Sequence, residues 1–227
     1  MYFRRGLSAS PELRRVARMT GRRIAPAALL LTPGAGAGRD HHTLLAIEEQ
    51  LAPLPCLRLD FPYRKAGRRA PDRAPVAIAH LVEQSAVFAA QRHIGPEQLV
   101  LGGRSYGGRM CSMAVAQGLP AAGLVLLSYP LHPPGQPTKL RTDHFPDIDV
   151  PVLFVSGDND PFGSPDEFAE HLHRIPGKVT QMWLPGGHDP RRADSPIAAA
   201  IAQWLTMLCA PSGVTGCACV AGVGSRS

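Results

Sequence analysis

Short, continuous runs of apolar residues alternate along the chain with longer stretches in which apolar residues recur every three or four positions. Runs of the first kind predict buried parallel strands, and stretches of the second kind predict amphipathic helices. The predicted strands are residues 27–32, 56–60, 99–101, 123–128, 152–156 and 179–184, and the predicted helices are residues 40–51, 76–93, 106–117, 165–174 and 196–208. This alternation predicts a single-domain α/β fold, with a mostly parallel sheet of about six strands and helices on both faces.

The two ends of the chain lack this pattern. Residues 1–23 have weak periodicity, and residues 210–227 are small and polar. Neither segment offers the apolar surface that a packed core requires. We therefore expect a flexible basic arm at 1–23, the folded domain at 24–209 and a flexible tail at 210–227.

The net charge of +6 belongs to the arm, which holds seven of the 24 basic residues but only one of the 18 acidic residues. The predicted domain is thus balanced and lacks the basic excess typical of nucleic-acid binding. No stretch approaches the roughly 20 apolar residues of a membrane span. The five cysteines have no regular spacing, which favours a reducing compartment. We expect a cytoplasmic protein that binds neither nucleic acid nor membrane; the pattern predicts no particular oligomeric state.

A serine between glycines stands where a predicted strand meets a predicted helix. Gly103-Arg104-Ser105-Tyr106-Gly107 fits the G-x-S-x-G pattern, in which a tight turn presents one serine at its tip. Glycine suits the positions two residues to either side, because a Cβ there would collide with the neighbouring strand or helix. Ser105 is therefore a candidate nucleophile.

A serine hydroxyl becomes a good nucleophile near neutral pH when a base takes its proton and a carboxylate orients that base. Parallel strands bring their carboxyl ends to one edge of the sheet, so the partners are expected to follow other strands. Asp158 and Asp160 follow the fifth predicted strand, and His188 follows the sixth. The order Ser, Asp, His predicts a triad of Ser105, His188 and one of the two aspartates, and the spacing leaves both aspartates open.

Acyl transfer also needs two backbone N–H groups that stabilise negative charge on the attacked carbonyl oxygen. Tyr106, the residue after the serine, supplies one such group, and the loop after the first strand supplies the other, for which Ala35 is the candidate. Gly34 and Gly36 let the backbone approach a substrate and are candidate substrate-binding residues. No pair of histidines has the spacing of metal ligands, so we predict neither a metal nor a cofactor.

The same loop is open to a second interpretation. A strand, the series Gly34-x-Gly36-x-Gly38, a helix, another strand and Asp60 resemble a dinucleotide-binding fingerprint with its ribose-binding acid. In G-x-G-x-x-G, however, the third glycine falls at position 39, which is Arg39. A dinucleotide-binding oxidoreductase is therefore the weaker alternative.

Together these segments resemble the α/β-hydrolase superfamily in its dienelactone-hydrolase-like region. They are most similar to the group that includes testis-expressed protein 30 and a subunit of a chromatin-bound acetyltransferase complex. The similarity runs from about residue 27 to residue 208. Its motifs are Thr32-Pro33-Gly34-Ala35-Gly36, Asp60-Phe61-Pro62-Tyr63, Gly103-Arg104-Ser105-Tyr106-Gly107-Gly108-Arg109, Ser128-Tyr129-Pro130-Leu131-His132-Pro133-Pro134-Gly135, Asp160-Pro161-Phe162-Gly163 and Gly187-His188.

The resemblance implies Ser105 as nucleophile, His188 as base and, through a G-x-x-D-P pattern, Asp160 rather than Asp158 as the acid. It implies a serine hydrolase that cleaves an ester, thioester or amide of a small-molecule substrate, with the proline-rich segment 129–149 too short for a large lid. Dienelactone hydrolase has a cysteine at the position of Ser105, so dienelactone is not the expected substrate. Members of the chromatin-associated branch serve as scaffolds, which makes a non-catalytic interaction module the alternative.

Two arginines near the predicted site are candidates for substrate binding. Arg64 lies in a basic loop, residues 61–75, and Arg104 directly precedes Ser105. The cations of that loop, Arg64, Lys65, Arg68 and Arg69, favour an acidic substrate, whereas a solvated basic loop is the plainer interpretation.

Overall fold

The computed structural model describes residues 25–190 and 192–209, so the arm and the tail expected at 1–23 and 210–227 lie outside the described residues. The elements follow the predicted alternation. They are β1 (Ala28–Thr32), α2 (His42–Gln50), β2 (Cys56–Arg58), α3 (Pro62–Lys65), α4 (Ala74–Gln91), η1 (Pro96–Gln98), β3 (Leu99–Arg104), α5 (Tyr106–Ala116), β4 (Gly123–Leu127), η2 (Phe145–Asp147), β5 (Val152–Gly157), α6 (Pro165–Leu172), β6 (Val179–Leu184) and α7 (Asp194–Cys209).

All six strands join in one sheet in the order β2-β1-β3-β4-β5-β6, and every neighbouring pair is parallel. The predicted fold class is therefore confirmed. Because the strands are parallel, their carboxyl ends meet at one edge, and the loops that follow β1, β3, β5 and β6 come together there.

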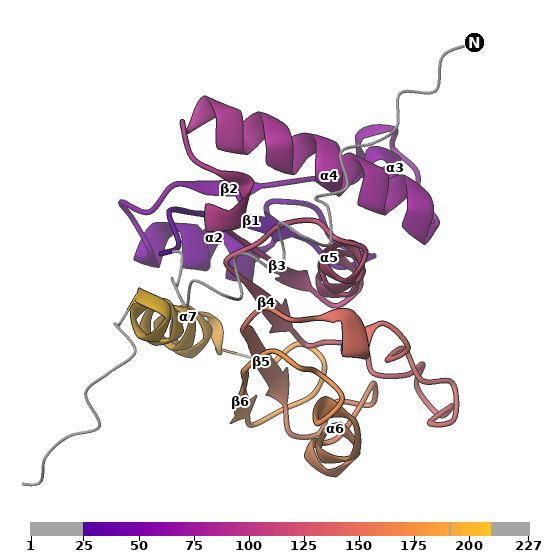
Figure 1. Cartoon of the computed structure of the whole chain (residues 1–227). Helices are drawn as coiled ribbons and strands as arrows, with labels where there is room; N and C mark the ends of the chain where they lie inside the picture. The colour runs from indigo at the N-terminus through magenta and orange to yellow at the C-terminus, as the bar shows by residue number, and fades with distance from the viewer. Residues whose placement is uncertain (1–24, 191, 210–227) are drawn as a thin grey trace, which may run out of the picture.

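The strand β1 shows why its apolar run is unbroken. Successive side chains of a strand point to opposite faces, so a strand covered on both faces is apolar throughout. Leu29 and Leu31 pack in a cluster with α2 and α7, whereas Ala28 and Leu30 pack in a second cluster with α4, α5 and α6. Figure 1 shows these helices around the sheet, with α4 and α7 on opposite sides of it.

Two segments predicted as loops contain single turns of helix. Residues 61–75 include α3, which begins at a proline, and residues 129–149 include η2. One turn is too short for apolar periodicity to reveal it. The strand before Ser105 also runs further than predicted and ends at Arg104.

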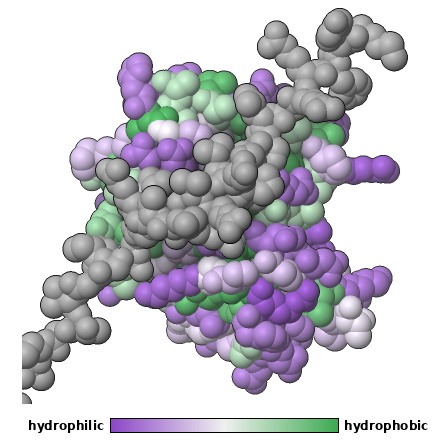
Figure 2. All heavy atoms as spheres, in the orientation of Figure 1, coloured by the Kyte–Doolittle hydropathy of each residue, from purple (hydrophilic) through white to green (hydrophobic). Residues whose placement is uncertain are grey.

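The exposed side of α6 is polar. Figure 2 shows hydrophilic side chains over α6 in the lower part of the view, and the exposed residues of that helix include Asp166 and Glu170. Within the described residues, no helix is both long enough and apolar enough to cross a membrane.

Candidate active site

Ser105 lies at the turn between β3 and α5, with φ 50° and ψ −116°. A positive φ is strained for a residue other than glycine. A Cβ on Gly107 would lie 2.5 Å from the carbonyl oxygen of Pro33, and a Cβ on Gly103 would collide with Thr32. The two glycines thus allow the turn to pack against the end of β1, and the turn has the geometry that the G-x-S-x-G pattern predicts.

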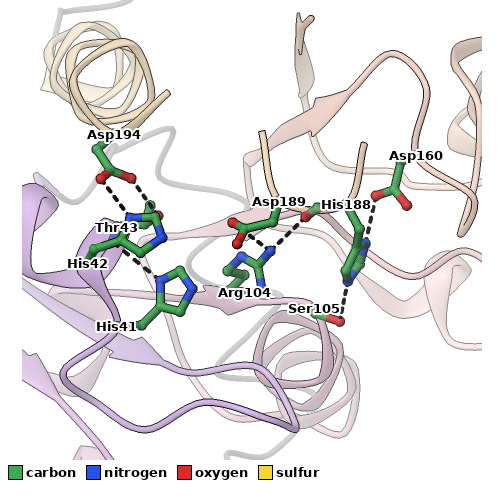
Figure 3. A network of polar contacts seen from close by, with 9 residues as sticks. All are labelled: His41, His42, Thr43, Arg104, Ser105, Asp160, His188, Asp189 and Asp194. Atoms are coloured by element: carbon green, nitrogen blue, oxygen red, sulfur yellow. Dashed lines mark hydrogen bonds and ion pairs between the residues drawn. The ribbon is translucent and has the colours of Figure 1, made fainter. Parts of the chain in front are cut away.

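Three side chains from three loops form a hydrogen-bonded series at this edge of the sheet (Figure 3). His188 Nε2 lies 2.8 Å from Ser105 Oγ, and His188 Nδ1 lies 2.8 Å from Asp160 Oδ2. The Asp160 side chain is only 1% exposed, and its Oδ1 accepts the N–H of Phe162 at 2.9 Å. A carboxylate beside Nδ1 keeps the imidazole proton on that nitrogen, which leaves Nε2 able to accept the serine proton.

The two aspartates of this loop have different partners. Asp158 is exposed, and its Oδ1 accepts the side-chain amide of Asn159 and the N–H of Gly186, each at 2.9 Å. Asp158 therefore links the loop after β5 to the loop after β6, whereas Asp160 contacts the imidazole of His188. The aspartate that contacts His188 in the structure is thus Asp160, the one that the family resemblance implies.

The loop after β1 lies against the serine. A Cβ on Gly34 would lie 3.6 Å from the Cβ of Ser105, so the glycine allows this close approach. Ala35 follows, and the N–H of Tyr106 is one of the first N–H groups of α5, which have no partner within the helix. The structure therefore brings the segment that contains Ala35 beside the turn that contains Ser105 and Tyr106.

Aromatic side chains, to which the sequence assigned no supporting role, hold this backbone in place. The Tyr63 hydroxyl donates to the carbonyl oxygen of Ala35 at 2.8 Å, and the Tyr106 hydroxyl donates to the carbonyl oxygen of Asp72 at 2.7 Å. Burial raises the pKa of both tyrosines, which keeps their hydroxyls protonated as donors. The Phe162 ring also packs on the His188 imidazole, with centroids 4.1 Å apart. All three side chains belong to motifs of the family resemblance, which was the sequence signal for them.

Arg104 contacts the loop that carries His188. Its Nη2 donates to the carbonyl oxygen of His188 at 2.7 Å and lies 2.9 Å from Asp189 Oδ1, and its side chain is only 12% exposed. Figure 3 shows the guanidinium facing this loop. The sequence suggested Arg104 for substrate binding, but in the structure it fastens the loop after β6 to the serine turn.

The two other candidate substrate-binding residues lie at the surface. Gly36 is exposed, and a Cβ added there would meet nothing within 4 Å. Arg64 is exposed on α3, and its Nη2 would lie 3.6 Å from a Cβ on Gly38. Arg64 thus neighbours the far end of the glycine loop, while Gly34 neighbours Ser105.

One group of possible metal ligands occurs among the described residues. His41, His42 and Asp189 each place a ligand atom within 4.8 Å of the others. The two imidazoles are stacked, with centroids 4.3 Å apart and planes 29° apart, so their in-plane lone pairs run side by side instead of converging on one ion. Asp189 is already paired with Arg104, whose charge opposes a bound cation. We therefore assign no metal to this group.

The acid of the dinucleotide-like pattern is also engaged. Asp60 Oδ1 accepts the backbone N–H of Arg39 at 2.8 Å, so the carboxylate closes its own glycine loop. In this position Asp60 stabilises the loop after β1. Its carboxylate thus has a structural role that explains its place without a bound ribose.

Comparisons with known proteins identify the family and the fold. A model of the alpha/beta hydrolase domain matches residues 25–200. Est1E from Butyrivibrio proteoclasticus, solved with ferulic acid, has a TM-score of 0.65 at 14% identity, with 81% of this chain and 90% of that chain covered. Dienelactone hydrolase from Anabaena variabilis has a TM-score of 0.63 at 17% identity, with 81% and 87% covered. The RedJ thioesterase of the prodiginine pathway in Streptomyces coelicolor has a TM-score of 0.61 at 15% identity, with 79% and 90% covered.

At these identities the solved structures establish a shared fold, and the family model carries the assignment. The match spans most of the chain and includes the turn at Ser105 and the loops that carry Asp160 and His188. The protein therefore belongs to the alpha/beta hydrolase family.

Proposed function

We propose that this protein is a serine hydrolase that cleaves an ester, thioester or amide bond of a small molecule through an acyl-enzyme. One observation carries the proposal: Ser105 Oγ and Asp160 Oδ2 each lie 2.8 Å from a different nitrogen of His188. Structural similarity to a dienelactone hydrolase and a thioesterase supports it.

Each residue has a role in the proposed reaction. Ser105 Oγ attacks the substrate carbonyl while His188 Nε2 takes its proton, and Asp160 stabilises the imidazolium that forms. The N–H groups of Ala35 and Tyr106 donate to the oxyanion of the tetrahedral intermediate. His188 then returns the proton to the leaving group, and water releases the acyl group by the same steps in reverse.

The narrower family placement and the location belong to the same proposal. The motifs around Asp60 and Ser128 support a place near the group of testis-expressed protein 30. A cytoplasmic location is supported by the irregular cysteine spacing, and the described cysteines Cys56, Cys111 and Cys209 are free.

A fluorophosphonate probe, which reacts with activated serines, tests the proposal directly. We expect the wild type to be labelled and Ser105→Ala to remain unlabelled. Ser85→Ala is the matched control, because Ser85 Oγ is buried on α4 without a hydrogen-bond partner. This control protein is expected to be labelled like the wild type. Equal labelling of the wild type and Ser105→Ala would refute the assignment of Ser105.

A further inference from the structure

Two arginines near the serine turn have no counter-ion. Among the described residues, no carboxylate lies within 4.0 Å of the guanidinium of Arg109 or Arg141, whereas Arg58, Arg68 and Arg104 all form ion pairs. The Nε of Arg109 is buried and has no hydrogen-bond partner. Leaving a buried donor of a charged group unsatisfied is costly, so such a group calls for a partner, and a bound ion is one of the partners that can supply it.

The two arginines belong to segments that contact each other. Ser112 Oγ donates to the carbonyl oxygen of Arg109 at 2.9 Å and lies 2.8 Å from Nε2 of His144, three residues after Arg141. Burial lowers the pKa of Arg141, and the charge of Arg109 lowers it further. Tyr129 interacts with both arginines. Its hydroxyl donates to the carbonyl oxygen of Arg141 at 2.6 Å. Burial raises the pKa of Tyr129, and the charge of Arg109 partly offsets this rise. Asp143, which also acts on the pKa of Tyr129, is exposed. The pair is therefore a partly buried concentration of positive charge.

Both arginines lie at the edge of the sheet that carries Ser105. Arg109 follows Ser105 by one helical turn, and its N–H donates to the carbonyl oxygen of Ser105 at 3.0 Å. Long side chains on a helix point back toward its N-terminus, which here is the serine turn. The N–H of Arg141 donates to the carbonyl oxygen of Leu131 at 2.8 Å, in the segment that follows β4.

We propose that Arg109 and Arg141 bind an anionic group of the substrate, so that the enzyme acts on an ester or thioester that also carries a carboxylate or a phosphate. The inference rests on the proposed function of Ser105. The planar guanidinium donates in pairs to such oxyanions, and an anion between two arginines neutralises their mutual repulsion. The basic loop at residues 61–75 is a weaker candidate for this role, because Arg68 is already paired with Asp72.

Matched substrates test the inference. The mono-p-nitrophenyl ester of glutaric acid carries a free carboxylate, its methyl ester is neutral, and a phosphonate analogue of the same length carries the other anion. For the wild type we expect kcat/KM to be at least about tenfold higher for an anionic ester than for the neutral one, since a charge-assisted hydrogen bond contributes this much. The carboxylate and phosphonate arms identify which anion is preferred.

The variants Arg109→Met and Arg141→Met are each expected to lower the anionic-to-neutral ratio by about tenfold, and the corresponding lysine variants are expected to recover part of it. Arg92→Met is the control: Arg92 is exposed at the end of α4 and contacts the ring of Phe88, and its loss is expected to leave the ratio unchanged. A wild type that hydrolyses the anionic and neutral esters equally would overturn the inference, as would methionine variants with the wild-type ratio.

Binding without turnover separates this inference from the proposed function. Calorimetric titration of Ser105→Ala with glutarate and with inorganic phosphate is expected to show binding that Arg141→Met and Arg109→Met weaken by about tenfold. Binding of this kind in a protein whose wild type hydrolyses no ester would refute the hydrolase and retain the anion site. Ester hydrolysis without any anion binding would refute the anion site and retain the hydrolase. Arg141→Lys, which keeps the charge, distinguishes lost anion binding from lost folding.

Discussion

Two aspartates in the loop after β5 provide a matched pair for a test at the scale of single residues. Asp160 contacts His188, and replacement by asparagine would favour the wrong imidazole tautomer. We expect Asp160→Asn to lower kcat for an activated ester by about 10³- to 10⁴-fold. In Asp158→Asn the amide oxygen still accepts the N–H of Gly186, so kcat is expected to stay within a few-fold of the wild type. Steady-state kinetics of both variants checks this, and equal losses would contradict the assignment of Asp160.

At the scale of residues, the sequence predicts the candidate triad, because its members follow one another along the chain in the order Ser, Asp, His. Ser105, His188 and the two aspartates follow strand ends, so their meeting could be predicted from a parallel sheet. The spacing alone left Asp158 and Asp160 open, because the choice depends on which carboxylate turns inward. Tyr63 was not predicted, since its contact with Ala35 joins residues that only the folded chain brings together.

At the scale of elements, the half-buried His144 joins the segment between β4 and β5 to α5. His144 Nε2 lies 2.8 Å from Ser112 Oγ, whose hydroxyl donates to the carbonyl oxygen of Arg109 at 2.9 Å. Burial, and then the charge of Arg109, lower the pKa of His144 to about 4 from its usual 6.5. The folded protein thus holds this imidazole neutral, in a pH range where the unfolded chain protonates it.

This difference in pKa makes stability depend on pH. Below pH 6.5, His144 is protonated in the unfolded chain but stays neutral in the folded protein. The free energy of unfolding therefore decreases as the pH falls from 6.5 toward 4. We expect the free energy of unfolding to fall by about 2 kcal/mol more between pH 7 and pH 4.5 in the wild type than in His144→Gln. Urea denaturation at both pH values measures this. His173→Gln, at an exposed histidine after α6, is expected to keep the wild-type decrease, and a wild-type decrease in His144→Gln would contradict the prediction.

The elements that sequence patterns missed are those too short to show a period. The turn α3 has four residues, begins at Pro62 and has no side-chain cap. Neither helical spacing nor a capping residue could therefore predict it from the sequence. The longer elements were predicted with errors of a few residues at their ends, where capping and tertiary contacts decide the boundary.

At the scale of the whole molecule, the chain's two tryptophans report on opposite faces of the sheet. Trp183 packs with the cluster of α4, α5 and α6, whereas Trp204 is 2% exposed in the cluster of α2 and α7. One parallel sheet joins the clusters, so we expect both faces to unfold together. In Trp183→Phe and in Trp204→Phe, the fluorescence of the remaining tryptophan and the far-ultraviolet circular dichroism are expected to give coincident urea midpoints. Separate midpoints would mean that the two faces unfold independently.

The fold as a whole was the most predictable feature, because alternating strands and helices permit few arrangements. The family model then confirmed the superfamily. The narrower grouping with testis-expressed protein 30, the limits of the domain and the roles of the site residues stay predictions.

The contact between Arg104 and the loop of His188 has a mechanical consequence. Arg104 and Ser105 are consecutive residues. The same short piece of backbone therefore carries the candidate nucleophile and the side chain that binds the loop of its candidate base, His188. Because both contacts start from one dipeptide, we expect a displacement of the serine turn to move Ser105 and the loop of His188 together, so that the Oγ–Nε2 distance changes less than the position of either group. The alignment of Ser105 with His188 then depends on this dipeptide and on the loop after β6.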